Sequence, residues 1–411
     1  MTTGIELLAA ATASLVALGA AEMWSHRRRL RTIETRIHVA GTRGKSSVTR
    51  LVAAGLRHAG IPTAAKTTGT LARMILPDGR EVPVFRPAGA NITEQIRITH
   101  AALQFGAKAL VLECMALQPA LHWVSERKLV RATHGVITNA RPDHLDVMGP
   151  TDADVAAALA GMVPVGGVLV TAEQKHLAVL ERAARDRRTR LLAVTAEDVA
   201  RVTEAELAPF SYLEHADNVA VALALLAELG IDREVALEGM WSARPDPGAL
   251  TEYEIDFFGR RVVFVNAFAA NDPQSTEMVW TMARERHPKA ERLVAVFNLR
   301  GDRPSRTEQL AREATFWHAA DRVVLMGGGA YLFAREASRI GVDADRFVYA
   351  DSDRLEEIFE GIMELCGPST LVIGMANIGG QGLGLVRLFR NRRTLGLEAP
   401  PLSRAALSNG A

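Results

Sequence analysis

The sequence predicts an α/β protein with two domains, preceded by one apolar helix. From Thr32 onward, short apolar runs alternate with stretches of helical character, which is typical of parallel sheets with helices on both faces. The alternation is interrupted by "SARPDPG" (Ser242–Gly248) and then resumes. Residues 4–24 are mostly apolar, with two glutamates near the ends and no basic residue. We therefore expect an anchor with a basic flank at 1–31, a central domain at 32–245, a smaller doubly wound Rossmann-like domain at 246–394 and a flexible tail at 395–411.

The composition excludes several classes of protein. Lys and Arg number 48 against 47 Asp and Glu, so no overall positive field attracts nucleic acid, and we expect none as a partner. Cys114 and Cys366 are too far apart in the sequence to indicate a disulfide framework or a zinc motif. Two isolated cysteines suit a reducing compartment.

The apolar segment Gly4–Trp24 just reaches the roughly 20 residues that a helix needs to cross a bilayer. Basic residues follow it directly in "HRRRLR" (His26–Arg31), and none precedes it. This asymmetry predicts a single-pass anchor in the cell membrane, with the N-terminus outside and the catalytic domains in the cytoplasm. A cleaved signal peptide would carry its basic residues first, which disfavours that interpretation. An alanine-rich buried or surface helix is the alternative.

Apolar runs predict the strands of both sheets. In the central domain the strand candidates are Arg36–Ala40, Ala109–Leu112, Gly135–Thr138 and Gly167–Thr171, and Asn218–Ile231 has helical character. In the second domain the strand candidates are "RVVFVNAF", "RLVAVFNL", "DRVVLMGGG", "RFVYA" and "STLVIGM", separated by the helix candidates Gln274–His287, Arg306–Ala319 and Asp353–Leu365.

A glycine-containing turn, "GTRGKSS", joins the first strand of the central domain to a helix. In a phosphate-binding loop, backbone N–H groups converge on the anion at a helix N-terminus, a lysine reaches the β- and γ-phosphates, and the next hydroxyl holds Mg²⁺. The residues that supply these parts are Gly41, Gly44, Lys45, Ser46 and Ser47. The stricter motif has a glycine in place of Val39, so a plain strand–helix turn with a solvent-facing lysine is the alternative.

Polar residues also follow two further strands of the same expected sheet. Glu113 ends the run "AKALVLEC", and a strand ending at Asn139 leads into a loop with Asp143 and His144. Each feature alone is equally compatible with a solvated strand end or a capped helix start. Together, at the carboxyl ends of parallel strands, they indicate one ligand-binding edge for a magnesium-bound nucleotide.

On these motifs the chain resembles the Mur ligase family of ATP-dependent amide ligases. The matching segments are "GTRGKSS", the strand-end glutamate, "TNARPDHLD", "EHADNVAVALALLAELGI", "SARPDPG", "NAFAANDPQST" and "NLRGDRPSR", in the family's order from about residue 36 to 393. The family pattern is "GTxGK[ST]", which accounts for Val39.

The resemblance implies a P-loop ATPase domain, ATP and Mg²⁺ as cofactors, and an acyl-phosphate intermediate. It implies catalytic roles for Lys45, Glu113 and His144, and Mg²⁺ ligands in Ser46, Glu113 and His144. The implied nucleotide-binding residues are Gly41, Thr42, Gly44, Lys45, Ser46, Ser47, Asn139, Asn218, Arg244, Asn271, Asp272 and Arg303. For Arg244 the alternative is a charged linker residue without a binding role. For Asn271, Asp272 and Arg303 the alternative is that they are solvated polar residues of loops. Many family members carry a carbamylated lysine for a second Mg²⁺, but near Leu159 this chain has none, so the number of metals stays open.

Within the family, the chain resembles the ligase subunit of bacterial poly-γ-glutamate synthase. The phosphate loop begins at residue 41, so we expect no uridine-nucleotide domain, and the shared segments are "RPAGANITEQ", "ECMALQP", "RPDHLDVMGPT", "NAFAANDPQST" and "GMANIGGQG". The resemblance implies a ligase that polymerises glutamate for a bacterial capsule or secreted polymer. Its implied partners are glutamate and the growing poly-γ-glutamate, integral membrane subunits of a synthase and export complex, and the lipid bilayer through residues 4–24, with a homo-oligomer left open.

The substrate side of the site is less defined. Thr68, Arg86 and Asn91 are candidates to contact substrate, with turn formation equally compatible for Thr68. A folylpolyglutamate-type ligase is the alternative enzyme, although it gives residues 4–24 no reason to be apolar. A membrane-tethered nucleotide-binding regulator or scaffold is the alternative from another class.

Overall fold

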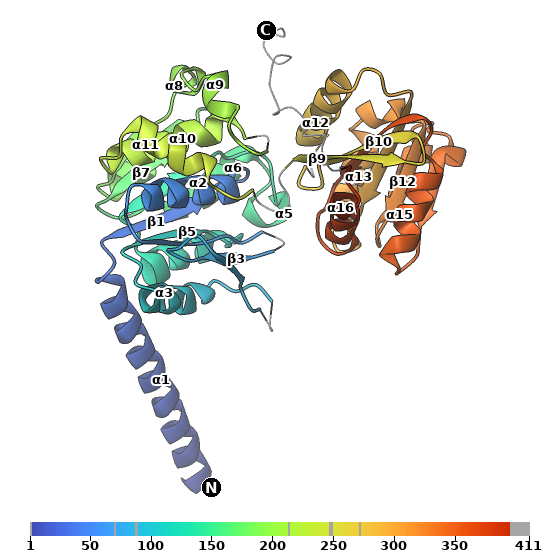
Figure 1. Ribbon diagram of the computed structural model, residues 1–411. Helices are drawn as coiled ribbons and strands as arrows, with labels where there is room; N and C mark the ends of the chain where they lie inside the picture. The colour runs from blue at the N-terminus through green and yellow to red at the C-terminus, as the bar shows by residue number, and fades with distance from the viewer. Residues whose placement is uncertain are drawn as a thin grey trace. The chain divides into compact units, whose positions relative to one another are not determined.

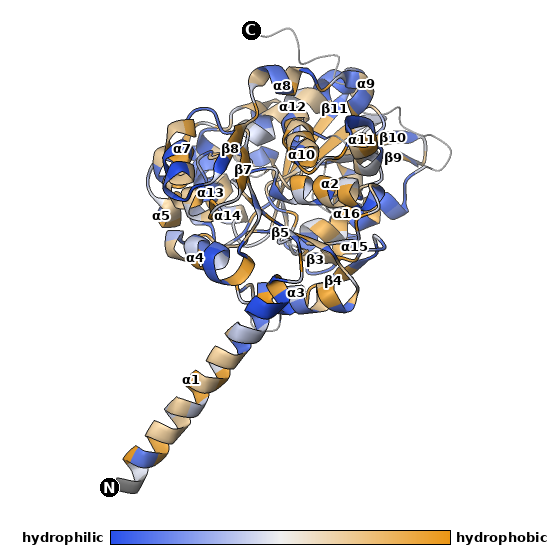
Figure 2. Ribbon diagram, turned by 90° about the vertical axis from the view of Figure 1, so that its left-hand side faces the viewer, coloured by the Kyte–Doolittle hydropathy of each residue, from blue (hydrophilic) through white to orange (hydrophobic). Residues whose placement is uncertain are grey.

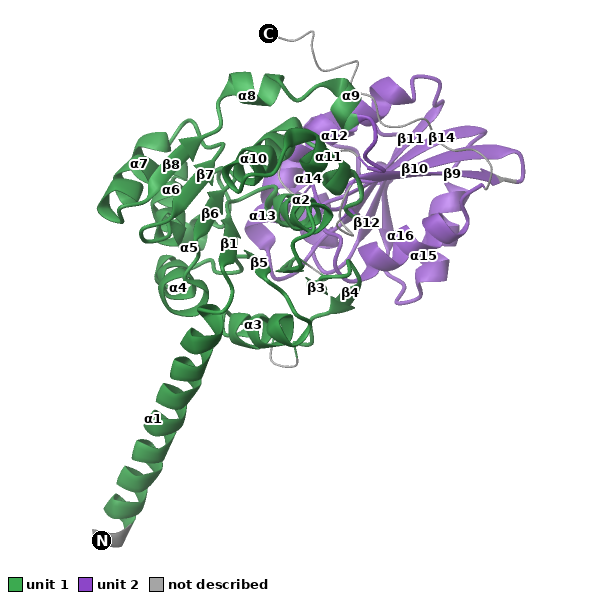
Figure 3. Cartoon of the chain, turned by 60° about the vertical axis from the view of Figure 1, so that its left-hand side comes forward, with its two compact units in different colours: residues 1–207, 214–244 green, residues 208–213, 245–411 purple. Residues whose placement is uncertain are grey.

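The computed structural model describes residues 2–69, 71–86, 89–212, 214–245, 250–270 and 273–394. The chain forms two compact units (Figure 3). Unit 1 comprises residues 1–207 and 214–244, and unit 2 comprises residues 208–213 and 245–411. Each unit contains one β-sheet with its own helices (Figure 1).

Helix α1 (Thr2–Leu30) begins the described chain and extends from unit 1 (Figure 2). Within the described residues it is the one helix that is long and apolar enough to cross a membrane, a criterion that N-terminal signal sequences also meet. Its large apolar side chains are exposed from Ile5 to Trp24. Its last turns pack on unit 1, where Leu30 is buried and the His26 ring Nε2 lies 2.6 Å from the Leu129 carbonyl oxygen.

Unit 1 is built on an eight-stranded sheet with the strand order β4-β3-β2-β5-β1-β6-β7-β8. The strands are β1 (Thr35–Ala40), β2 (Thr63–Lys66), β3 (Arg73–Ile75), β4 (Glu81–Pro83), β5 (Ala109–Glu113), β6 (His134–Ile137), β7 (Val168–Thr171) and β8 (Arg190–Ala193). All neighbours pair in parallel except β2–β3 and β3–β4, which are antiparallel.

Helices cover both faces of this sheet. On one face α2 packs with α10 and α11, and on the other α3 and α4 lie with η1, a π-helix (Figure 1). The bounds are α2 (Lys45–His58), α3 (Glu94–Gln104), α4 (Pro119–Val124), η1 (Ser125–Val130), α5 (Leu145–Met148), α6 (Asp152–Leu159), η2 (Ala160–Met162), α7 (Leu177–Asp186), α8 (Ala196–Ala200), α9 (Glu204–Leu207), α10 (Ala216–Glu228) and α11 (Arg233–Trp241).

The central strands of unit 1 are continuous apolar runs because both of their faces are buried. Ile37 and Val39 of β1 are completely buried, as are Leu110 and Leu112 of β5. This packing fixes the strand ends, and with them the loops that follow the strands.

Unit 2 has a six-stranded sheet with the order β13-β12-β11-β14-β10-β9. Its elements are β9 (Thr251–Phe257), β10 (Arg260–Asn266), α12 (Pro273–Arg286), β11 (Arg292–Asn298), α13 (Pro304–Arg312), η3 (Phe316–Ala319), β12 (Arg322–Met326), α14 (Ala330–Arg339), η4 (Ala344–Arg346), β13 (Phe347–Ala350), α15 (Leu355–Glu364), β14 (Ser369–Met375) and α16 (Gln381–Asn391). One core cluster joins the sheet to α12, α13 and α14, and the other joins it to α15 and α16. In the second cluster the Phe264 and Phe389 rings stack with centroids 3.9 Å apart.

The predicted α/β class is confirmed, but both sheets are mixed where the sequence predicted parallel ones. In unit 2 the departure is the hairpin of β9 and β10, turned at Phe258 and Gly259, which both have positive φ. A two-residue turn of this kind suits the twist of an antiparallel pair. In unit 1 the antiparallel strands are three residues long and lie at the sheet edge.

Candidate active site

The loop between β1 and α2 has the backbone form of an anion-binding turn. Gly41 and Gly44 have φ values of 128° and 80°, and Gly44 caps the helix that starts at Lys45. A Cβ on Gly41 would lie 2.0 Å from Thr138 Oγ1, and one on Gly44 would lie 2.2 Å from Asn218 Oδ1. Glycine is therefore required at both positions by conformation and by space. The α2 N-terminus directs N–H groups and a positive dipole end at this turn.

Asn139, at the end of the neighbouring strand, holds this loop in shape. Its Oδ1 accepts hydrogen bonds from the Thr42 hydroxyl (2.6 Å) and the Arg43 backbone N–H (3.1 Å), and its Nδ2 donates to the Arg43 carbonyl (3.2 Å). The Thr138 hydroxyl donates to the same carbonyl (2.6 Å). Thr42 and Asn139 thus join the loop after β1 to the end of β6.

Lys45 lies folded over the loop. Its Nζ donates to the carbonyls of Gly41 (2.7 Å) and Thr42 (3.1 Å). Burial lowers the pKa of Lys45, while the nearby charges of Glu113 and Asp143 oppose that shift. The ammonium group therefore lies in the field of carboxylates from two different strand ends. Ser47, in the same first turn of α2, is half-buried.

Glu113 ends β5 beside this turn and is almost fully buried. Its Oε2 accepts from the Ser46 hydroxyl (2.9 Å) and the Thr68 backbone N–H (2.7 Å), and its Oε1 accepts from the Thr68 hydroxyl (2.6 Å). The structure thus brings together Ser46 and Glu113, both expected at the metal, and makes Thr68 the carboxylate's second partner. These hydrogen bonds hold the Glu113 carboxylate in one orientation beside the first turn of α2.

His144 lies in the loop after β6, where it caps α5 with φ 49°. Its Nε2 is 3.9 Å from Asp143 Oδ1. Nowhere in the described parts of the chain do three His, Cys, Asp or Glu residues gather in a metal-binding group. Of the three residues expected at the metal, Ser46 and Glu113 are the two that a hydrogen bond joins.

Asn218 lies in the first turn of α10, close to the glycine turn. It is buried, and its Nδ2 donates to Glu214 Oε1 (2.7 Å) while its Oδ1 faces Gly44.

Arg86 and Asn91, the two other substrate candidates, both contact Glu94. The Arg86 guanidinium donates two bonds to the Glu94 carboxylate (2.7 and 3.1 Å) and one to the Thr68 carbonyl (3.3 Å). The Asn91 backbone N–H also donates to Glu94 (3.3 Å), and the Asn91 side chain accepts from Thr93. Buried Lys66 completes the cluster with its Nζ 3.0 Å from Glu94 Oε2.

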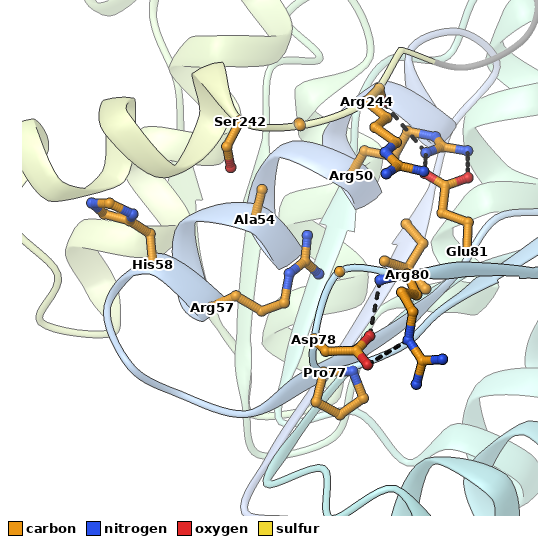
Figure 4. A pocket seen from close by; sticks show the side chains of 13 residues that line it. Arg50, Ala54, Arg57, His58, Pro77, Asp78, Arg80, Glu81, Ser242 and Arg244 are labelled. Atoms are coloured by element: carbon orange, nitrogen blue, oxygen red, sulfur yellow. Dashed lines mark hydrogen bonds and ion pairs between the residues drawn. The ribbon is translucent and has the colours of Figure 1, made fainter.

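Arg244 lies in a different part of unit 1. It lines a pocket of about 430 Å³ together with Arg50, Arg57 and Glu81 (Figure 4). Arg50 makes a two-bond ion pair with Glu81 (2.5 and 3.2 Å) and donates to the Arg244 carbonyl (3.4 Å). The structure therefore groups Arg244 with a pocket along the later turns of α2.

In unit 2, Arg303 caps α13 and lines a small depression with Asn298 and Asn377 at the carboxyl ends of β11 and β14. The Asn298 Nδ2 donates to the carbonyls of Asn377 (2.6 Å) and Gly379 (2.8 Å). Asn271 and Asp272 lie outside the described residues.

A buried network that the sequence interpretation did not single out lies directly behind Glu113. Cys114 Sγ is 3.6 Å from His122 Nδ1, and His38 Nδ1 is 2.8 Å from Glu126 Oε2. Burial disfavours the charged forms of Cys114 and His38. Hydrogen bonds from His122 and His38 nevertheless lower the pKa of Cys114 to about 6. Likewise, the bonds of His38 to Cys114 and Glu126 raise its pKa to about 9.

Sequence inspection also missed Lys66 and Glu94, which connect Arg86 to the strand ends. The available signals were a lysine at a strand end in "KTTGT" and a glutamate in "NITEQ". Neither signal reveals the pairing, because the two residues are far apart in the chain and meet only after the sheet has formed.

The glycine turn, its lysine and the strand-end carboxylate, followed by a second α/β unit, define an ATP-dependent ligase of the Mur type. Residues 39–226 match the Mur ligase middle domain, and residues 252–392 match the poly-gamma-glutamate synthase CapB C-terminal domain.

Relatives with the same organisation identify the branch of the family. The chain is 34% identical to PGA synthase CapB of Bacillus subtilis (strain 168), over 92% of this chain and 96% of that protein. It is 38% identical to capsule biosynthesis protein CapB of Bacillus anthracis, over 79% of this chain and 69% of that protein. The chain belongs to the CapB family of Mur-type ligases.

Solved structures agree in fold. The bifunctional folylpolyglutamate synthase/dihydrofolate synthase of Yersinia pestis, complexed with AMPPNP and a Mn ion, aligns with a TM-score of 0.62 at 16% identity. The alignment covers 90% of this chain and 92% of that protein.

Proposed function

We propose that this chain is a membrane-anchored ligase that uses ATP to join glutamate residues into poly-γ-glutamate. The observation that carries the proposal is the 34% identity to a PGA synthase over almost the full length of both chains. The arrangement of Lys45, Ser46 and Glu113 supports it, because these groups supply the parts that phosphoryl transfer from ATP requires.

The reaction has two steps. A carboxylate oxygen of one substrate attacks the γ-phosphorus of ATP, the bond to the β-phosphate oxygen breaks, and ADP leaves. The amine nitrogen of the second substrate then attacks the acyl carbon, phosphate leaves, and the nitrogen loses a proton; either glutamate or the growing polymer can take either part. Phosphorylation supplies the leaving group that a free carboxylate lacks.

Each residue of the edge has a proposed task. Lys45 exchanges its two carbonyl partners for β- and γ-phosphate oxygens. Gly41, Thr42, Gly44 and Ser47 form the phosphate turn around it, and Asn139 keeps that turn rigid. We also retain His144 for Mg²⁺, and Asn218, Arg244, Asn271, Asp272 and Arg303 for the nucleotide, as predictions.

The donor set fits Mg²⁺. This cation prefers oxygen ligands, and Glu113 and Ser46 present carboxylate and hydroxyl oxygens within 2.9 Å of each other. When bound there, Mg²⁺ would neutralise phosphate charge. Thr68 orients Glu113 through two hydrogen bonds, so the carboxylate is held before any cation arrives.

On the substrate side, we retain Thr68, Arg86 and Asn91 as predictions. To meet a glutamate carboxylate, Arg86 would have to exchange its present partner, Glu94, for the substrate. Buried Lys66 would then still neutralise Glu94.

We further propose a division into an anchor at 1–31, a P-loop domain at 32–245, a Rossmann-like domain at 246–394 and a tail at 395–411. With α1 in the cell membrane and the basic flank on the cytoplasmic side, synthesis would lie next to export. We propose integral membrane subunits of the export complex as partners and leave a homo-oligomer open.

The test is incorporation of labelled glutamate by membranes that carry the full chain. We expect ADP formation and acid-stable polymer only when both ATP and glutamate are supplied. Stimulation by a pterin substrate would favour the folylpolyglutamate-type alternative. ATP turnover indifferent to every amino acid would contradict a ligase and leave the regulator.

A further inference from the structure

The last turns of α1 combine an aromatic residue with a run of arginines. From Gly4 to Trp24 the helix rises by roughly 1.5 Å per residue, so its exposed apolar part is about as long as a bilayer core is thick. Trp24 is 66% exposed, and the Arg28 guanidinium lies 5.8 Å from its ring centroid. Tryptophan at this position is typical of the membrane–water interface. The residues that follow it would lie at the level of the lipid headgroups.

A pocket of about 370 Å³ opens at this level on unit 1. It combines residues at the end of α1 with residues of the globular core. Arg27 lies in the last turn of α1 and Arg31 directly follows the helix, Arg36 comes from β1, and Arg127 and Arg131 come from η1 and the residue after it. The pocket therefore forms only where the helix meets the folded unit, at the amino ends of the strands.

Four guanidinium groups of this arginine pocket have no salt-bridge partner. Among the described residues, Arg27, Arg31, Arg127 and Arg131 form no ion pair, whereas Arg50 and Arg80, two of the four arginines that line the other pocket of unit 1, each pair with an acid. The one acid in the lining, Glu126, is already occupied, with its oxygens bonded to His38 and to the Ala132 backbone N–H.

Arg36 is fixed by the backbone rather than by an acid. Its guanidinium donates to the carbonyls of Arg131 (2.9 Å), Leu30 (3.2 Å) and Ile33 (2.5 Å). These bonds join the end of α1 to the turn after η1 and hold one positive charge in the lining. Like charges held together cost free energy, and an anion would remove that cost.

Backbone conformation supports a functional pocket independently of charge. The lining includes a π-helix, η1, and π-helical turns are frequent at functional sites. Arg131 directly after it has φ 50°, a left-handed conformation that is uncommon for a residue with a side chain. Such conformations persist where the surrounding structure enforces them, and they cluster at binding sites.

We propose that this arginine pocket binds the phosphate headgroup of an anionic phospholipid of the inner leaflet. The inference rests on the membrane anchoring in the proposed function. Basic pockets next to a membrane helix recognise such headgroups, and guanidinium forks match phosphate oxygens. A bound lipid would fix the angle between α1 and the rest of unit 1, and so hold the catalytic residues at a set distance from the membrane.

The experiment uses the full chain in detergent micelles with equal amounts of phosphatidylglycerol and phosphatidylcholine, and native mass spectrometry counts the lipids retained. The variant is Arg31→Gln/Arg131→Gln. The control, Arg182→Gln/Arg185→Gln, removes the same charge from exposed positions of α7. We expect preferential retention of phosphatidylglycerol, reduced roughly 20-fold by the pocket variant and unchanged in the control.

Three results would overturn the proposal. One is equal retention of both lipids, and another is retention that the pocket variant does not reduce. The third is displacement of the lipid by inorganic phosphate or by a short γ-glutamyl oligomer, which would assign the pocket to a free anion or to the polymer. Glutamate-dependent ADP formation is measured on the same samples. Lipid retention without ligation would refute the proposed function alone, and ligation without selective retention would refute the lipid site alone.

Discussion

The two ends of the central strands in unit 1 present opposite arrangements of charge. At the carboxyl ends, Lys45 faces the buried carboxylate of Glu113 and the charge of Asp143. At the amino ends, the arginine pocket contains several guanidinium groups. The one acid in its lining, Glu126, is bonded to His38 and to the Ala132 backbone N–H. Both ends are suited to phosphate, but in different ways.

The difference matches the two proposed tasks. The phosphates of ATP react at the carboxyl ends, whereas a lipid phosphate stays bound at the amino ends. In the proposed function, Lys45 meets the β- and γ-phosphates at the carboxyl edge, and Ser46 and Glu113 would hold Mg²⁺ there. At the amino edge, four arginines of the pocket have no salt-bridge partner among the described residues, which favours a bound anion. Lysine and arginine are not interchangeable in these tasks, because arginine stays charged at every accessible pH.

Replacing Lys45 should have the largest effect. Lys45→Ala removes the ammonium that meets the β- and γ-phosphates, so we expect kcat/KM for ATP in glutamate ligation to fall roughly a thousandfold. The matched control is Lys108→Ala, an exposed lysine just before β5, at the amino end of that strand. Phosphatidylglycerol retention should be unchanged in both variants. Ligation within a few-fold of wild type in Lys45→Ala would refute the catalytic edge.

Glu113→Gln should have the next largest effect. The amide keeps nearly the same shape but loses the negative charge, so we expect about a hundredfold lower kcat and a higher Mg²⁺ requirement. The Mg²⁺ concentration for half-maximal ADP formation measures this. Glu34→Gln, an exposed acid just before β1, is the control. An unchanged Mg²⁺ requirement would place the metal elsewhere.

The strands that could be predicted in unit 1 are apolar runs in the interior of the sheet, although β2, which is fully buried and ends in Lys66, was not predicted. β1, β5, β6 and β7 were predicted within one residue at either end because they are short apolar runs. The antiparallel edge strands escaped detection. β9 alternates charged Glu254 and Asp256 with Tyr253 and Ile255, and β4 is three residues long and ends in Pro83. Neither contains an apolar run. Both are edge strands, which pair with a neighbouring strand along one side only.

The site could be predicted where it follows strand order and not where it depends on tertiary pairing. The positions of Ser46 and Glu113 at adjacent strand ends follow from the parallel sheet. The bond from Thr68 to Glu113 and the cluster of Arg86 with Glu94 depend on loops whose path the sequence does not define. The roles of these residues stay predictions until the variants are measured.

A smaller effect is expected at Thr68. Thr68→Val keeps the backbone N–H bond to Glu113 but removes the hydroxyl donor at 2.6 Å. Losing one hydrogen bond to a charged group costs about 1.5 kcal/mol, so we expect roughly tenfold lower kcat. Thr68→Ser restores the hydroxyl and should recover most of the activity. If the serine variant is as impaired as the valine variant, packing of the methyl group rather than the hydrogen bond supports Glu113.

The smallest effect, a pH dependence of a few-fold, compares the two ends directly. Burial lowers the pKa of Lys45 below its ordinary value of 10.5, and only the ammonium form attracts phosphate. ADP affinity should therefore be complete at low pH and weaken as pH rises through this lowered pKa. The arginine pocket keeps its charge over the same range, so phosphatidylglycerol retention should stay constant. Calorimetry and native mass spectrometry between neutral and alkaline pH measure the two, and Lys45→Arg should remove the alkaline loss of ADP affinity. Parallel loss at both ends would mean that unfolding, rather than the lysine, produces the pH dependence.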